Sequence, residues 1–588
     1  MGYNNFDVAV YCSVREAIGI AEHPELEKEF DFFSKHVQIS KVYLETYRGK
    51  LLIERDQIIK AKQFFTQKGI RTSGGITTDV SGGWEFKTFC YTNQEQMELL
   101  QKVVRFTAEL FDEIIFDDFF FTNCKCESCI RAKGNRSWSE FRTELLRKVS
   151  DEIIVKTAKQ VNPNVTLIIK YPNWYEEYQN TGYNLADEPK LFDKVYTGTE
   201  TRDPNLTQQT LQRYTSYFIM RYLENVKPGC NGGGWFDSFD CAYNLGSYAE
   251  QSYLTLFAKA REVTMFSIGS LIFKNPVFIP IAGFTFEKVD QFVGLLGNPL
   301  GIAAYKPYHS YGENYLHGYL GMLGLPLEPT PVFPEESNLL LLTESAGHDP
   351  EIVNRIKKQL QNGKEVVITS GLLKVLAGRG IEEVIEIRYT DRKVAVDKFA
   401  YPMYECSFGN YFDSPKIIIP QIESATNDCI QSIVAFADGK VYPILLKAKY
   451  GSGVLYVLTI PDHFGDIYNY PAAVLDEIRR ILSKDIKVTM EGPGQVGLFV
   501  YDNDTFIVES FLPYHTDVKI SVKSKNAELV DLVTGKKVEG LAAGDKTEFQ
   551  LKLGPASYQV YSFGEGNKII YHRDTEAQEE NKQYNGDF

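Results

Sequence analysis

The chain has 588 residues, of which 44% are hydrophobic and 24% charged, and this composition predicts a soluble protein of three or four domains. Its formal net charge of −14 and pI of about 5.3 argue against nucleic acid as a partner, because such binding needs clustered Lys and Arg side chains. No apolar run reaches the roughly 18 residues of a membrane span.

The amino terminus, MGYNNFDVAVYCS, has neither a basic n-region nor an apolar h-region. This is expected of a cytoplasmic protein, or of a periplasmic or secreted one whose signal peptide has been removed.

From Phe6 to about Pro326, short β-rich runs alternate with amphipathic helical stretches, which predicts a parallel α/β fold. Eight such units favour a (β/α)8 TIM barrel over residues 1–326. A doubly wound sheet is the alternative, but the turn after the first strand, YCSVREAIG, is not the glycine-rich phosphate turn of that fold. The eight predicted strands are residues 7–13, 41–47, 69–77, 113–120, 166–173, 194–201, 232–239 and 262–269.

The proline-rich stretch near 326–336 predicts a linker to a second, smaller domain over residues 337–485. Its predicted strands at 339–345, 365–371 and 451–460, with helices near 350–362 and 470–483, indicate a flavodoxin-like or amidotransferase-like α/β sheet. Without a Cys-His pairing, this domain is expected to serve structure or oligomerisation. Alternating runs over residues 486–565 predict a C-terminal antiparallel β-sandwich, followed by a polar tail at 566–588.

The fourth predicted strand ends in the adjacent pair Asp117 and Asp118. The CxCxxC motif of Cys124, Cys126 and Cys129 follows at once, and three thiolates at this spacing are typical of tetrahedral zinc. The nearest earlier candidate for a fourth ligand is Cys90, and a closed four-cysteine site of this kind would be structural. The alternative is free buried thiols.

In a TIM barrel, chemistry is carried by the carboxyl ends of the strands. The residues that fall there are Glu45, Asp117, Asp118, Lys170, Tyr171, Glu200 and Asp237, and most of them are acidic. Paired carboxylates with different pKa values are what glycoside hydrolysis uses. Three tryptophans near strand ends, Trp84, Trp174 and Trp235, suit stacking on sugar rings, although filling the core is an equally good interpretation.

Other catalytic chemistries are poorly represented. None of the eight histidines falls at a predicted strand end, and the sequence contains no HExxH, Walker, GxSxG or dinucleotide motif. No organic cofactor is therefore predicted. Two further alternatives remain, a catalytically inactive sugar-binding or scaffold protein and a non-glycosidic zinc enzyme with an open coordination position.

The chain resembles glycoside hydrolase family 42, the β-galactosidases. The resemblance rests on Cys90 in TFCYTNQEQMELLQKVV, on CKCESC after Asp117 and Asp118, and on the order of barrel, amidotransferase-like domain and small β-domain. It implies a glycosidase acting on an oligosaccharide or other glycoside, a Zn²⁺ site at Cys90, Cys124, Cys126 and Cys129, and a homotrimer.

The catalytic positions differ from the family pattern. Where the family has Asn-Glu, this chain has Asp117-Asp118, and WFDSFDC supplies Asp237 where the family places its nucleophilic glutamate. The resemblance thus implies Asp118 as acid/base and Asp237 as nucleophile, each shorter by a methylene group, which leaves galactose specificity and the choice between retention and inversion open.

Within the same chemistry, a second assignment makes Asp118 the nucleophile and Glu200 the acid. In either case Glu45, Asp117, Lys170, Tyr171, Trp174 and Trp235 are the candidates for binding the sugar.

Overall fold

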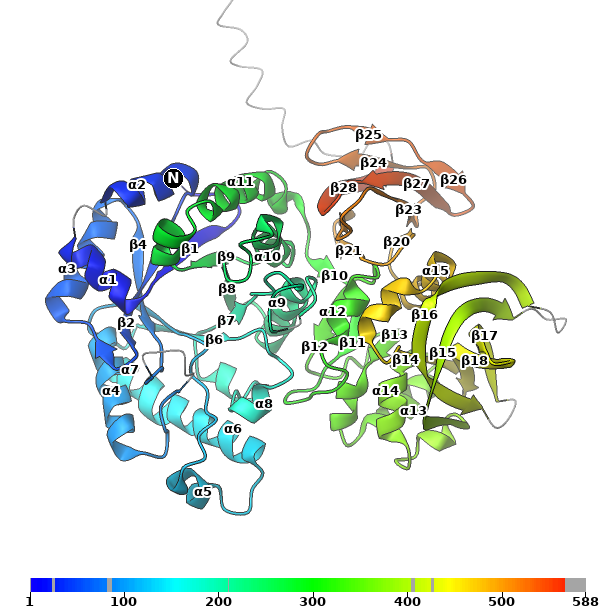
Figure 1. Ribbon diagram of the computed structural model, residues 1–588, viewed down its shortest axis with the longest axis horizontal. Coiled ribbons are helices and arrows are strands. Elements are labelled where there is room, and N and C mark those ends of the chain that lie inside the picture. Colours follow the sequence, from blue (N-terminus) through cyan, green and yellow to red (C-terminus); the bar gives the residue numbers. More distant parts are fainter. Residues whose placement is uncertain are drawn as a thin grey trace, which may run out of the picture.

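The structure is a computed structural model that describes residues 2–23, 27–81, 87–209, 211–402, 408–424 and 428–565. Three units follow one another along the chain (Figure 1). The barrel lies on one side, the middle domain on the other, and the C-terminal β-domain contacts both.

The first unit is a closed barrel of eight parallel strands. β1 pairs with both β9 and β2, which closes the ring in the order β1-β9-β8-β7-β6-β5-β4-β2. The strands are β1 (Asp7–Cys12), β2 (Lys41–Arg48), β4 (Arg71–Ile76), β5 (Glu113–Phe116), β6 (Thr166–Tyr171), β7 (Lys194–Gly198), β8 (Asn231–Asp237) and β9 (Glu262–Phe266). The short β3 (Leu51–Leu52) pairs antiparallel with β2. All eight predicted strands form, but several end earlier than expected, and Asp117 and Asp118 follow β5 in a loop.

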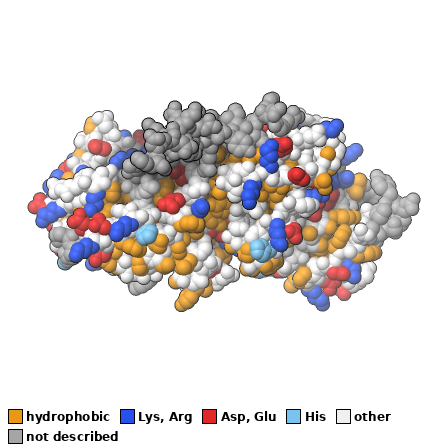
Figure 2. Space-filling view, turned by 90° about the horizontal axis from the view of Figure 1, so that it is seen from above, with side chains coloured by type: hydrophobic (Ala, Val, Ile, Leu, Met, Phe, Trp, Pro, Cys, Tyr) orange, Lys and Arg blue, Asp and Glu red, His pale blue; other side chains and the backbone are white. Residues whose placement is uncertain are grey.

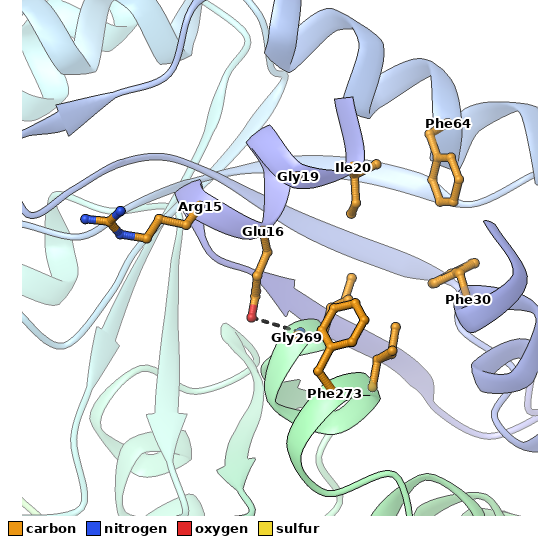
Figure 3. A pocket seen from close by; sticks show the side chains of 10 residues that line it. Arg15, Glu16, Gly19, Ile20, Phe30, Phe64, Gly269 and Phe273 are labelled. Carbon is orange, nitrogen blue, oxygen red and sulfur yellow. Dashed lines mark hydrogen bonds between the residues drawn. The ribbon is translucent and has the colours of Figure 1, made fainter. Parts of the chain in front are cut away.

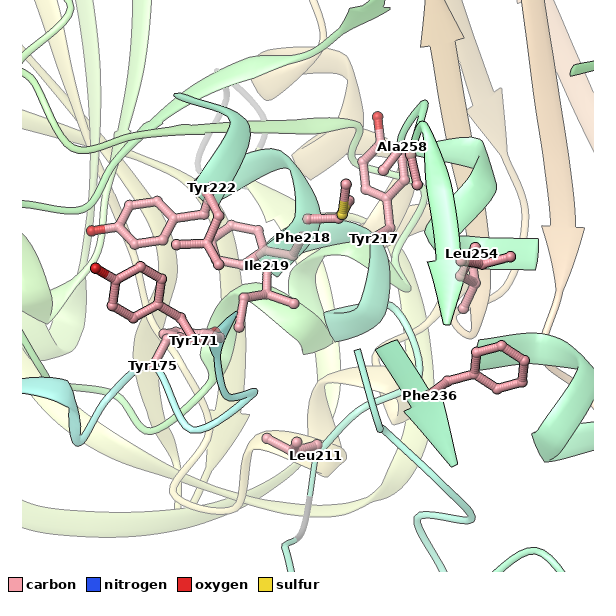
Figure 4. Packing of buried hydrophobic residues seen from close by; sticks show 14 of the residues in the cluster. Tyr171, Tyr175, Leu211, Tyr217, Phe218, Ile219, Tyr222, Phe236, Leu254 and Ala258 are labelled. Carbon is pink, nitrogen blue, oxygen red and sulfur yellow. The ribbon is translucent and has the colours of Figure 1, made fainter. Parts of the chain in front are cut away.

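Helices surround the barrel because each strand must be covered on its outer face. They are α1 (Val14–Glu22), α2 (Glu27–His36), α3 (Arg55–Gln67), α4 (Gln94–Ala108), α5 (Glu127–Lys133), α6 (Trp138–Val149), α7 (Lys156–Val161), α8 (Tyr178–Thr181), α9 (Thr215–Val226), α10 (Leu245–Phe257) and α11 (Phe278–Asp290). Large aromatic side chains fill the layer between helices and strands, as around Tyr217, Phe218 and Tyr222 of α9 (Figure 4). A second set of buried side chains, including Tyr11, Tyr43 and Trp235, fills the barrel interior.

The middle domain is a mixed nine-stranded sheet. Its parallel part contains β11 (Ile302–Tyr305), β12 (Leu327–Thr330), β13 (Leu339–Leu342), β14 (Glu365–Thr369) and β19 (Gly453–Leu458). Its antiparallel part contains β15 (Ile387–Pro402), β16 (Phe408–Ser424), β17 (Cys429–Ala437) and β18 (Lys440–Tyr450). The helices are α12 (Leu316–Gly321), α13 (Ile352–Gln361), α14 (Ser370–Leu376) and α15 (Ala472–Leu482).

Two features of this sheet differ from the sequence prediction. The four long antiparallel strands were not predicted, and β12 occupies part of the stretch expected to be a linker. Leu327 and Pro329 alternate inward along β12, so the proline-rich composition hid a short edge strand. The assignment of this domain as amidotransferase-like stays a prediction.

The C-terminal domain is the predicted antiparallel β-sandwich. One sheet contains β21 (Val496–Tyr501), β22 (Thr505–Ser510), β24 (Ala527–Asp531), β25 (Lys537–Val538) and β28 (Ser557–Glu565), with β10 (Pro299–Leu300) at its edge. The other contains β20 (Val488–Glu491), β23 (Thr516–Val522), β26 (Leu541–Ala543) and β27 (Lys546–Leu553). Two buried hydroxyl groups bind it to the barrel: Tyr253 donates to Glu509 Oε1 at 2.8 Å, and Tyr501 donates to the Phe257 carbonyl at 2.8 Å.

On the face shown in Figure 2, acidic and basic side chains lie side by side with apolar ones. Within the described part of the chain, no helix has the length and apolar character needed to cross a membrane.

Candidate functional site

A hydrogen-bonded acidic network begins at the carboxyl end of β2. Arg48 Nε donates to both oxygens of Glu45, at 2.9 and 3.1 Å, and Arg48 Nη2 donates to Asp117 Oδ2 at 3.0 Å. Tyr11 Oη donates to Glu45 Oε1 at 2.7 Å, and Thr77 Oγ1 lies 3.2 Å from Asp117 Oδ2. Glu45 and Asp117, from the ends of the second and fourth predicted strands, are thus joined by one guanidinium group.

Lys170, on β6, is the centre of the site. Its Nζ lies 2.6 Å from Asp118 Oδ2, 3.0 Å from Glu200 Oε1 and 3.5 Å from Asp117 Oδ1. It also lies 4.3 Å from the centroid of the Trp235 ring. Because an ammonium group has three donors, all of them are taken by these carboxylates, and Lys170 has no free donor for a ligand.

Asp237 is held separately at the end of β8. Arg202 donates from Nε to Oδ1 at 3.0 Å and from Nη2 to Oδ2 at 2.7 Å, a bidentate arrangement. The backbone N–H of Phe239 also donates to Oδ1, at 3.0 Å. This fork holds both oxygens of the carboxylate in one orientation.

The carboxyl groups of the site have different pKa values. Burial, together with Asp117 and Glu200, raises the pKa of Asp118 to about 7, although Lys170 acts in the opposite direction. Burial likewise raises the pKa of Glu200, with Asp237 adding to the effect. Burial alone would also raise the pKa of Asp117, but Lys170 and Arg48 hold it below its usual range.

Two adjacent carboxyl groups with separated pKa values are suited to acid/base chemistry, one giving a proton and one staying ionised. Asp118 is also the more accessible of the pair, since 19% of its side chain is exposed against 4% for Asp117. Asp118 is therefore the carboxyl group that is both accessible to a ligand and able to donate a proton to it.

Aromatic side chains form one wall of the mouth. The Trp235 ring centroid lies 4.7 Å from Tyr11 and 5.6 Å from Phe266, and Phe266 lies 6.0 Å from the half-exposed Phe239. Arg202 lies 5.3 Å from the Phe239 ring. A cluster of aromatic rings that are inclined to one another therefore lies next to the carboxylates.

The structure places two of the predicted site residues elsewhere. Tyr171 points out of the barrel, where its hydroxyl donates to Glu188 at 3.1 Å and its ring packs on Tyr183, because side chains alternate along β6 and Lys170 takes the inward position. Trp174 packs edge-to-face on Phe121. Trp84 lies outside the described residues.

Sequence reasoning missed the two arginines. Arg48 is the last residue of β2, and Arg202 lies two residues after Glu200. In both cases a basic residue lies within three residues of an acidic residue at a predicted strand end. This was a usable signal, because a buried carboxylate must be paired.

An apolar cavity of about 240 Å³ lies outside the barrel wall between α1, Phe30, Phe64 and the segment after β9 (Figure 3). The carboxylate of Glu16 at its edge is already used, since it accepts from Gly269 N at 2.8 Å and Ser13 N at 2.7 Å. The guanidinium group of Arg15, the other charged residue of the lining, points away from Phe30 and Phe64 (Figure 3), so the carboxylate mouth is the better candidate site.

The four predicted metal ligands come together. The thiol sulfurs of Cys90, Cys124, Cys126 and Cys129 all lie within 4.8 Å of one another, and Cys90 Sγ is 3.6 Å from both Cys126 and Cys129. Zinc–sulfur bonds of about 2.3 Å in a tetrahedron place the sulfurs about 3.8 Å apart, so the cluster fits such an ion. Cys90 follows β4 and the other three follow β5, so the cluster joins those two loops.

Comparison with known proteins agrees with this architecture. Residues 1–290 match the family model described as probable glycosyl hydrolase, catalytic domain, and residues 487–563 match the one described as probable glycosyl hydrolase, C-terminal domain. Residues 297–463 match the second domain of the uncharacterized protein SSO3021. That protein, from Saccharolobus solfataricus, is 26% identical over 538 residues, covering 82% of this chain and 87% of the relative.

Two solved structures share the fold over nearly the whole chain. A β-galactosidase from Bacillus circulans sp. alkalophilus has a TM-score of 0.65 at 11% identity, covering 96% of this chain and 99% of that one. The α-L-fucosidase isoenzyme 2 from Paenibacillus thiaminolyticus has a TM-score of 0.64 at 12% identity, covering 96% and 100%. The predicted barrel and β-sandwich are confirmed, and the resemblance to the β-galactosidase is one of fold.

Proposed function

We propose that the chain, whose first 290 residues match a glycosyl hydrolase catalytic domain, cleaves an O-glycosidic bond at the barrel mouth. The observation that carries this proposal is the presence at the mouth of two differently held carboxyl groups: Asp118, whose pKa is raised to about 7, and Asp237, which lies in the fork of Arg202. A carboxyl group that is half protonated near neutral pH is suited to protonating a leaving-group oxygen.

In this mechanism Asp118 gives its proton to the glycosidic oxygen as the bond to the anomeric carbon breaks. Asp237 attacks the anomeric carbon or activates a water molecule. The half-exposed Phe239 offers its ring to the apolar face of the sugar, whereas Glu45, Asp117 and Trp235, which are at most 3% exposed, hold the neighbouring groups in place. Lys170 acts through Asp118 and Glu200, since its donors are taken.

A second assignment of roles has its own support. Lys170 Nζ lies 2.6 Å from Asp118 Oδ2 and 3.0 Å from Glu200 Oε1. The distance between these two carboxylate oxygens therefore cannot exceed the sum of the two contacts. The two contacts are compatible with the separation of about 5 to 5.5 Å in a retaining pair. Asp118 would then be the nucleophile, and Glu200, whose pKa is also raised, the acid.

The test begins with a panel of aryl α- and β-glycosides and NMR identification of the first anomer released. A hit gives the sugar and the stereochemical outcome together. Turnover with Asp118→Asn, Glu200→Gln and Asp237→Asn is then measured with and without azide. Only the variant that lacks the nucleophile is expected to yield a glycosyl azide of inverted configuration. Sugar binding without any turnover would instead establish the sugar-binding protein.

We further propose that Cys90, Cys124, Cys126 and Cys129 bind one Zn²⁺ and that the ion is structural, because four thiolates fill its coordination sphere. Such a centre would hold the loop that carries Asp118 against the loop that follows β4. The homotrimer implied by the resemblance stays a prediction, for which the molar mass in solution is the measurement.

A further inference from the structure

Two consecutive residues just before α9 contact the two other domains. Gln212 Oε1 accepts a hydrogen bond from Tyr468 Oη of the middle domain at 3.1 Å. Arg213 donates from Nη2 to the carbonyl of Phe511 in the C-terminal β-domain, and its guanidinium carbon lies 5.2 Å from the centroid of the Phe511 ring. The end of this barrel segment is therefore held by side chains and backbone from outside the barrel.

Arg213 also forms an ion pair with α10. Its Nη1 lies 3.1 Å from Glu250 Oε2, and the two side chains are 19% and 5% exposed. The next residue of the helix, Gln251, donates from Nε2 to the backbone carbonyl of Asp237 at 3.1 Å. Arg213 is thus bonded both to the C-terminal domain and to the helix that holds the backbone of Asp237.

The first turn of α9 leads back to the other acidic group of the mouth. Ser216 Oγ donates to the backbone carbonyl of Thr199 at 2.8 Å and lies 2.8 Å from Thr201 Oγ1. These two threonines stand on either side of Glu200, and Arg202 is the next residue. The start of α9 is therefore tied to the segment that carries both Glu200 and the guanidinium fork.

We propose that Arg213 is a positioning residue, through which the C-terminal β-sandwich holds the segments that carry Glu200 and Asp237 at the barrel mouth. Acid/base and nucleophilic groups must be held close to their productive geometry, and a displacement of about 1 Å can cost about 100-fold in rate. The effect on turnover rests on the function proposed above, whereas the effect on the order of the two segments does not.

A matched control lies on the same helix. Arg221 donates from Nε to Glu328 Oε2 at 3.1 Å and from Nη2 to Glu328 Oε1 at 2.6 Å, which joins α9 to β12 of the middle domain. Removing either arginine leaves a largely buried carboxylate without its partner, so both losses are expected to lower the unfolding temperature. Only the loss of Arg213 is expected to reach the mouth.

The experiment compares wild type with Arg213→Met, Arg213→Lys and Arg221→Met. The values of kcat and KM are measured on a glycoside that the wild type cleaves, and hydrogen exchange is measured for the backbone amides of residues 199–209. Arg213→Met is expected to lower kcat about 10- to 100-fold with KM nearly unchanged, and to speed exchange over residues 199–209. Arg221→Met is expected to keep the wild-type kcat and exchange in spite of its lower unfolding temperature.

Arg213→Lys is expected to recover only part of kcat, because an ammonium group lacks the fork that reaches two partners at once. It also carries the comparison if Arg213→Met does not fold. Equal losses of kcat in the Arg213 and Arg221 variants, or wild-type exchange over residues 199–209 in the Arg213 variants, would overturn the positioning role. If the wild type cleaves no glycoside, the proposed function fails, and the exchange measurement still decides whether Arg213 holds this segment.

Discussion

Asp118→Asn tests the electrostatic account of the site, because it removes the charge while keeping the shape of the protonated acid. The pKa of Asp118 is about 7 in the folded protein, against about 3.9 for an ordinary aspartate. This difference of about three pH units corresponds to a free energy on the order of 4 kcal/mol.

The raised pKa of Asp118 determines how the stability of the protein changes with pH. Because the folded protein binds the proton more tightly than the unfolded chain, wild type is stabilised below about pH 4 and loses that contribution as the pH rises to about 7. Asparagine has no proton to lose. We therefore expect Asp118→Asn to match wild type near pH 4 and to be more stable by up to about 4 kcal/mol at pH 8, with turnover of unactivated glycosides largely lost.

The assay is the thermal unfolding temperature of both proteins between pH 4 and 8, with Asp240→Asn as the control. Asp240 is exposed and lies on the loop after β8, so its substitution removes one charge near the mouth without unburying a carboxylate. A variant less stable than wild type at pH 8, or a difference that does not change with pH, would refute the raised pKa of Asp118 and with it the assignment as proton donor.

Three further outcomes are expected. In wild type, kcat/KM for a glycoside with a poor leaving group should fall above about pH 7, as Asp118 loses its proton. In Lys170→Met this fall should move to higher pH, because the ammonium group lowers the pKa of Asp118. An unchanged pH profile would show that Lys170 does not lower the pKa of Asp118. Arg202→Met should lose about 3 to 5 kcal/mol of stability and nearly all turnover, because Asp237 is left buried without its partner. Arg202→Lys should recover only part of both, because lysine cannot form the two-pronged contact with the carboxylate. Full activity of either variant would contradict the role of Arg202 in holding Asp237. Metal analysis should find one zinc per chain in wild type and none in Cys129→Ser, whose unfolding temperature should match that of chelator-treated wild type.

The barrel was readable from the sequence because its strands are buried on both faces. Apolar runs such as residues 114–116, which are followed by Asp117 and Asp118, have few other structural explanations. The same end-of-strand rule found Glu45, Asp117, Asp118, Lys170, Glu200 and Asp237, all of which come to the mouth. The cysteine cluster was equally local, since three of its ligands lie within six residues.

Tertiary structure decided what these residues do to one another. The alternation along β6 turned Lys170 inward and Tyr171 outward, and strand register alone sets that choice. The pairing of Arg48 with Asp117 and of Arg202 with Asp237 joins side chains that lie 69 and 35 residues apart in the sequence, a spacing that carries no local signal.

The sequence by itself therefore determined which groups reach the barrel mouth, because the hydrophobic pattern fixes the strands and their ends. Only the closed barrel decided which carboxylate is paired, which is protonated and which is accessible, because a pKa depends on the charges and burial that distant segments bring together.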